Sequence, residues 1–167
     1  MIKPPTQLFV ITALLAFVLC GCASTDEQLS FYNKIDVPIP VSSERTVLGN
    51  GPMFVAQQTP LLVYRVINHA EITATGSDKS PFEFFTSVFS SPEGTVENSL
   101  ISSLEDYTIS AKEKGGIKVY FLENHQETKL YITSPDLDFV IEVISEGEDS
   151  QHNTNAIFNK IKLTNRT

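Results

Sequence analysis

The stretch from residue 107 to residue 144 most constrains the fold, because strand patterns and turn patterns follow one another along it. Residues 107–111 and 129–133 alternate in polarity, and residues 117–122 and 139–144 supply further strands, of which the last is the most apolar. Three groups of residues typical of tight turns separate them, namely Gly115-Gly116, Asn124-His125-Gln126 and Ser134-Pro135-Asp136. Short strands joined by tight turns predict an antiparallel meander.

Helices are predicted on both sides of this meander in the sequence. Ser80-Pro81-Phe82-Glu83 combines a capping box with proline at the first helical position, and Ser91-Pro92-Glu93 repeats the start signal. The second of these helices carries an apolar stripe of Val96, Leu100, Leu104 and Tyr107. Asp149-Ser150 is expected to cap a terminal helix, whose apolar face consists of Ile157, Phe158 and Ile161. We therefore expect an α+β fold, an antiparallel sheet with helices packed mainly on one face.

Residues 44–76, which precede the first helix, have a strand-rich pattern. Residues 61–67 give its strongest strand signal, and the group Gly49-Asn50-Gly51-Pro52 marks a turn. Residues 70–75 either continue that strand beyond a bend or return as a hairpin.

The first 22 residues have the organisation of a secretory leader. Lys3 gives a positive start, and an apolar run from Leu8 to Leu19 is too short to span a bilayer. The tetrapeptide Leu19-Cys20-Gly21-Cys22 resembles the lipobox of bacterial lipoproteins. This resemblance implies signal-peptidase cleavage between Gly21 and Cys22, with palmitate-type acylation of Cys22.

The same resemblance implies a location for the mature chain. Ala23, rather than aspartate, follows the acylated cysteine. In enteric-type bacteria this implies an outer-membrane lipoprotein facing the periplasm, and in a Gram-positive host it implies the outer face of the single membrane. We expect three parts: a signal peptide (1–21), a lipidated N-terminus with a flexible tether containing two prolines (22–43), and one extracytoplasmic domain (44–167).

Composition excludes several kinds of function. The net charge is −8, and no basic stripe offsets it, so nucleic acid is not an expected partner. Cys20 and Cys22 are the two cysteines, so the domain itself is expected to have no disulfide and no thiol chemistry. We expect no cofactor.

The C-terminal part, residues 107–163, resembles the PsbP/DcrB-like fold. The corresponding segments are an antiparallel meander ending in the strand 138–144, an acidic turn, and a short helix ending in the stretch 157–163. The resemblance implies a binding or assembly factor rather than an enzyme.

The polar residues suggest no clear catalytic or metal site. His69, His125 and His152 lack a metal-ligand spacing, and Asp136 and Asp138 are better explained as turn residues than as a catalytic pair. Residues 146–153 form an acidic segment, which we interpret as a solvated loop before a helix, with weak calcium binding as the alternative. The sequence contains no catalytic motif of the nucleophile-elbow, Walker or dinucleotide-binding type.

The phenylalanine-rich segment 82–89 provides the one candidate surface. As a helix it places Phe82, Phe85 and Phe89 on one face and Phe84 with Val88 on another. If only the first face enters the core, Phe84 and Val88 form an exposed surface for a partner or ligand; the alternative is a helix buried on both faces. We therefore expect a non-catalytic envelope lipoprotein that binds another envelope protein. The alternative is a carrier of a small apolar ligand held between sheet and helix, and an enzyme ranks third.

Overall fold

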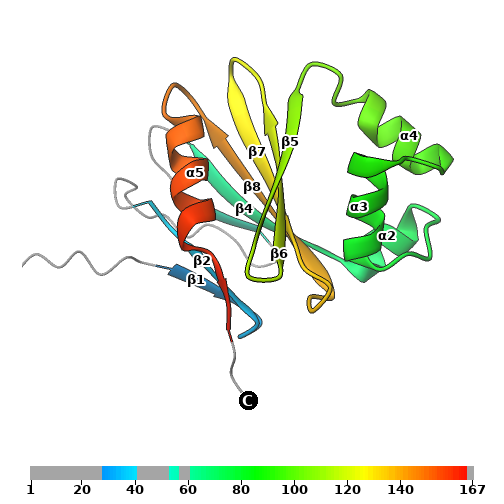
Figure 1. Cartoon of the computed structure of the whole chain (residues 1–167), viewed down its shortest axis with the longest axis horizontal. Helices are drawn as coiled ribbons and strands as arrows, with labels where there is room; N and C mark the ends of the chain where they lie inside the picture. The colour runs from blue at the N-terminus through cyan, green and yellow to red at the C-terminus, as the bar shows by residue number, and fades with distance from the viewer. Residues whose placement is uncertain (1–27, 41–52, 57–60, 165–167) are drawn as a thin grey trace, which may run out of the picture.

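A six-stranded antiparallel sheet forms the centre of the protein, with its strands in the order β3-β4-β8-β7-β6-β5. The computed structural model describes residues 28–40, 53–56 and 61–164 (Figure 1). The strands are β3 (Met53–Ala56), β4 (Leu62–Asn68), β5 (Thr108–Lys114), β6 (Ile117–Glu123), β7 (Glu127–Thr133) and β8 (Phe139–Glu146). The predicted meander is confirmed as β5 to β8, and the segment 61–67 is confirmed as a strand, β4, which pairs with β8.

The turn between β5 and β6 follows directly from its sequence. Gly115 and Gly116 have φ angles of 56° and 77°, in the left-handed region where glycine has no steric penalty. This conformation reverses the chain in two residues and sets Lys114 opposite Ile117. The register of the hairpin is fixed by this tight turn.

Helices cover both faces of the sheet. On one face lie α2 (His69–Ala74), α3 (Pro81–Ser90) and α4 (Thr95–Ser102), whereas α5 (Ser150–Lys160) lies on the other (Figure 1). The α+β class with an antiparallel sheet is confirmed. Three of the four described helices do share a face, but the terminal helix, which we had grouped with them, packs on the opposite face.

The helix starts show which local signals were decisive. At α3 the predicted capping box is present, because Ser80 Oγ accepts from the amide of Glu83 and the Glu83 carboxylate accepts from the amide of Ser80. The interpretation of residues 70–75 as strand was wrong: residues 70–74 belong to α2, and Thr75 is its C-cap. The helix begins after a second capping box, formed by Asn68 and Glu71. The start signal at residues 91–93 was also misplaced, since α4 begins at Thr95 after Gly94.

A second sheet corrects the expected tether. It has three strands in the order β1-β2-β9, with β1 (Gln28–Phe31), β2 (Ile35–Pro38) and β9 (Lys162–Leu163). Ile35 and Val37 of β2 are fully buried, and the hydroxyl of Tyr64 on β4 donates to the carbonyl of Pro38 over 2.9 Å. Residues 28–40 are therefore part of the folded domain, because alternate apolar side chains enter the core and Pro38 only ends the strand. The domain begins at Gln28 or earlier, not at residue 44.

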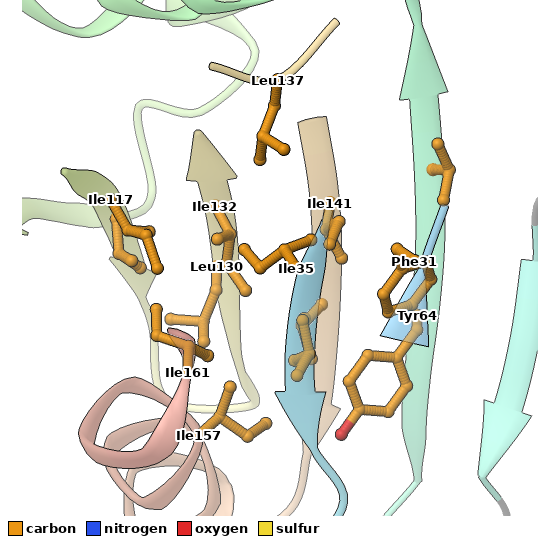
Figure 2. Close-up of a cluster of buried hydrophobic side chains, with 14 of the residues drawn as sticks. Phe31, Ile35, Tyr64, Ile117, Leu130, Ile132, Leu137, Ile141, Ile157 and Ile161 are labelled. Carbon is orange, nitrogen blue, oxygen red and sulfur yellow. The ribbon is translucent and has the colours of Figure 1, made fainter. Parts of the chain in front are cut away.

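The six-stranded sheet separates two hydrophobic cores. Figure 2 shows the first, in which Ile157 and Ile161 from the α5 end and Ile35 from β2 point at Leu130, Ile132 and Ile141 of the sheet. The second core lies on the other face, where α3 supplies Phe84, Phe85 and Val88. The strands β1 and β2 and the helix α5 thus belong to one face, and α2, α3 and α4 belong to the other.

Candidate functional site

Phe84 and Val88, the candidate partner surface, are buried in the second core. Their exposed fractions are 4% and 1%, so of the two interpretations the exposed aromatic patch is wrong. The reason is that α3 lies between the sheet and α4, so side chains on both of its faces find partners. The alternative of a helix buried on both faces holds for these two residues.

The aromatic residues of α3 pack against tyrosines of the sheet. The ring of Phe85 stacks on Tyr131 with centroids 4.9 Å apart, and Phe89 lies 4.6 Å from the ring of Tyr120. Phe84 meets Phe85 edge to face, with an interplanar angle of 79° and centroids 5.5 Å apart. These contacts fix α3 over β6 and β7 and leave Ile67 of β4, farther along the sheet, only half buried.

A hollow of about 630 Å³ lies beside α3, between α2, α4 and β4. We call it the α3 groove. Its apolar lining consists of Ile67, Ile72, Phe84, Phe85, Val96 and Leu100, and its polar lining of Arg65, Glu71, Thr75, Thr95, Ser99 and Ser103. The groove therefore offers an apolar floor between a charged edge on β4 and α2 and a hydroxyl-bearing edge on α4.

The charged edge is held in place by a network that reaches into the core. The Arg65 guanidinium donates to the Glu71 carboxylate over 2.7 Å and lies 3.6 Å from that of Glu142. The Tyr131 hydroxyl donates to the other oxygen of Glu142 over 2.8 Å. The pKa of Tyr131 is raised, mainly by burial and in addition by the charge of Glu142. Its hydroxyl therefore stays protonated and keeps donating. Arg65 is thereby positioned at the groove by two carboxylates.

The hydroxyl-bearing edge has free hydrogen-bonding capacity. Thr95 and Ser99 are exposed on α4, one helical turn apart, and no hydrogen bond among the described residues uses their hydroxyls. Ser103, one turn further, donates instead to the carbonyl of Leu100. An occupant of the groove could hydrogen-bond to Thr95 and Ser99 without breaking a contact within the described part of the chain.

The other candidate residues do not converge on a site. His69, His125 and His152 are exposed and belong to α2, the β6–β7 turn and α5. The carboxylate of Asp138 pairs with Lys34 at 2.9 Å, which lowers the pKa of Asp138, whereas the amide of Asp136 hydrogen-bonds to Ser134 within the turn. Glu146, Glu148 and Asp149 are exposed before α5. No cluster of three or more potential metal-ligating side chains occurs within residues 28–40 and 61–164.

The lipidation residue Cys22, the cleavage position at Gly21 and the turn at residues 49–52 lie outside the described residues. Within the described ranges, no helix has the length and apolar character needed to cross a bilayer.

The groove itself was missed at the sequence level, although part of its signal was present. Val96 and Leu100 belonged to the predicted apolar stripe of α4, but Ile72 was assigned to a strand, and Ile67 was predicted only as the end of the strand 61–67. A groove built from three separate segments depends on long-range packing, which no local pattern reports.

No protein-family model matches this chain, and no curated protein sequence matches it either. Among solved structures it is similar to the solution structure of cyanobacterial PsbP (CyanoP) from Synechocystis sp. PCC 6803. The two share 11% identity with a TM-score of 0.39, over 86% of this chain and 95% of that chain. These values assign no function to this chain. The fold class rests on its own strands and helices, and the PsbP/DcrB-like resemblance of residues 107–163 stays a prediction.

Proposed function

We propose that this protein is a lipid-anchored, non-catalytic binding module of the bacterial envelope, and that its α3 groove holds apolar side chains of a partner polypeptide. The observation that carries the proposal is the groove, an apolar floor beside α3 with hydrogen-bonding edges. Polypeptide segments offer both components at once, since apolar side chains alternate with backbone amides and carbonyls.

The shape of the groove favours a polypeptide over a free small molecule. Small-molecule sites usually bury about 70–90% of the ligand surface. The groove edges carry exposed residues such as Thr75, Thr95 and Ser99, so a small apolar ligand would keep part of its surface in water. A partner protein covers the groove with its own surface and excludes that water.

The anchor belongs on the other face of the sheet. If Cys22 carries lipid, five residues separate it from β1, and their fully extended length to Gln28 is about 20 Å. The strand β1 belongs to the core that contains α5, whereas the α3 groove is lined by residues of the opposite core. Figure 1 shows α5 on one side of the large sheet and α2, α3 and α4 on the other. This arrangement favours an occupant that approaches from the aqueous side, such as another envelope protein, over a lipid leaving the bilayer.

A second candidate function is the carriage of a small apolar ligand. It is supported by the volume of about 630 Å³ and by the presence of Phe84 and Phe85 in the groove wall. This volume lies within the range of about 300–1,000 Å³ that is typical of ligand pockets.

Photo-crosslinking tests the proposed function with a matched pair of variants. A photoreactive amino acid at Thr95, at the groove edge, is activated in the full chain in its native membranes. Ser99→Arg puts a charged side chain into the groove, whereas Ser102→Arg makes the same change on the same helix outside the groove lining. Both positions are exposed, so both variants should stay within about 0.5 kcal/mol of the parent's stability.

We expect one discrete protein adduct at Thr95 that falls at least about tenfold with Ser99→Arg and persists with Ser102→Arg. An adduct of equal yield in both variants would show that the partner does not use the groove. If no protein adduct forms, and Nile red instead binds with a Kd that Ser99→Arg weakens and Ser102→Arg does not, the small-ligand function replaces the proposed one.

A further inference from the structure

The helix α4, which forms one wall of the α3 groove, has an unusual attachment to the rest of the protein. It packs mainly on α3, and its apolar residues Val96, Leu100 and Ile101 are only partly buried. The one residue of α4 that is buried is Glu97, at 4% exposure. A charged side chain thus occupies the place that an apolar anchor usually takes in a docked helix.

Glu97 joins α4 to the start of α3 through a lysine. The Lys79 ammonium donates to the Glu97 carboxylate over 2.8 Å and to the Ser87 hydroxyl over 2.9 Å. This hydrogen bond, together with the opposite charges, lowers the pKa of Glu97 and raises that of Lys79. A charge-assisted bond of this kind is stronger than a neutral one. Here it adds to the contacts that the partly buried apolar residues of α4 make with the second core.

Gly94 lies against the carboxylate of Glu97. It precedes α4 with φ −90° and ψ 162°, a conformation open to any residue, and it makes no side-chain cap. A Cβ at this position would lie 2.0 Å from Glu97 Oε2 and 2.9 Å from Glu97 Cδ. The glycine therefore leaves the space into which the Glu97 side chain folds to reach Lys79.

We propose that α4 is a movable wall of the α3 groove, held closed by the Lys79–Glu97 pair and opened when a partner enters. This inference rests on the proposed function, because it concerns how the same groove is regulated. A segment with few buried apolar contacts opens locally at lower free energy than the core. When α4 moves outward, Val96 and Leu100 leave the groove, and the side chains of Phe84 and Phe85 become more accessible to a partner.

Amide hydrogen exchange of the full chain tests whether α4 opens locally when no partner is present. We expect the amides of α4 to exchange at least about tenfold faster than those of β8, which is central in the sheet. Glu97→Gln should speed exchange in α4 by a further factor of up to about ten and leave β8 unchanged, since the amide oxygen that replaces the carboxylate carries no charge to pair with Lys79. Glu105→Gln removes an exposed charge just beyond α4 and should have no such effect.

A second variant separates the pairing from the charge. Gly94→Ala keeps both Lys79 and Glu97, but its Cβ overlaps Glu97 Oε2, so the carboxylate must shift. We therefore expect it to accelerate α4 exchange, by less than Glu97→Gln does. If α4 and β8 exchange at the same rate in the parent, or if neither variant changes α4 alone, the movable wall is overturned.

The Thr95 photo-crosslink then distinguishes failure of the wall from failure of the groove. Glu97→Gln should change the adduct yield at least about threefold, because it changes how often the groove is open. An unchanged yield overturns the regulatory role. If the protein without substitutions forms no Thr95 adduct that Ser99→Arg reduces, while α4 exchanges as expected, the proposed function is overturned and the movable wall is still supported.

Discussion

Phe84 lies at the junction between the core and the α3 groove, since it is almost fully buried and still forms part of the groove wall. The sequence pattern placed it correctly on the face of α3 opposite Phe82 and Phe89. What covers that face depends on α2, α4 and the sheet, which come from other parts of the chain. The burial of a single residue could therefore not be predicted, even though its place on the helix could.

Replacing Phe84 tests this assignment. Phe84→Ala should lower the free energy of unfolding by about 3–5 kcal/mol, because it removes a buried ring and leaves a cavity. Phe82→Ala, on the same helix at a partly exposed position, should cost clearly less. Urea unfolding followed by circular dichroism measures both. If both variants lose the same free energy of unfolding, Phe84 is not a core residue.

At the scale of elements, most of the strands and helices could be predicted, and the failures have physical causes. The meander β5–β8 and the helix α3 follow from turn and capping signals within a few residues. The helix α2 was missed because Ile72, Thr73 and Thr75 favour strands locally, and the Asn68–Glu71 capping box prevailed over that preference. The two-residue strand β9 exists only through pairing with β2, so no local pattern could reveal it.

The Lys79–Glu97 pair predicts that the stability of the protein depends on pH. The Lys79 hydrogen bond lowers the folded-state pKa of Glu97 below its ordinary value of 4.5. The stabilisation is therefore complete above that value and is lost as the pH falls through the lowered pKa. We expect the parent to be more stable than Glu97→Gln at neutral pH, with a difference that shrinks between about pH 5 and pH 3. Urea unfolding across this range measures it, and a constant difference would contradict the assignment.

At the scale of the whole molecule, the two faces of the six-stranded sheet have different tasks in the proposed function. The small sheet and α5 cover the face next to the proposed anchor, and α2, α3 and α4 form the groove on the other. The sequence predicted an α+β domain behind a lipobox, but not this division. Which face a helix covers depends on chain crossings that local periodicity does not encode.

The proposed lipid anchor is tested at its acceptor residue, Cys22. Cys22 is the cysteine that follows a small residue, Gly21, so Cys22→Ser should abolish palmitate labelling and block lipoprotein-type cleavage. Cys20→Ser, which removes the other cysteine, should leave both intact. Labelling that persists in Cys22→Ser would refute the lipobox assignment.

The start of the folded domain is tested by truncation of the chain. A chain starting at Gln28 retains every described residue, whereas a chain starting after Pro40 loses β1 and β2. The lost segment contributes four buried apolar side chains, Phe31, Ile35, Val37 and Ile39. Each is worth about 1.5–3 kcal/mol as an upper estimate, so their sum is comparable with the whole stability of a typical domain, about 5–15 kcal/mol.

We therefore expect the chain from Gln28 to unfold cooperatively, with a melting temperature that reductant does not change because it contains no cysteine. The chain from residue 41 should lack a cooperative transition, since the sheet face covered by β1 and β2, which includes Tyr64, would be exposed to water. Near-ultraviolet circular dichroism and thermal melting distinguish the two. A cooperative transition in the shorter chain at the same temperature would mean that residues 28–40 are a tether after all.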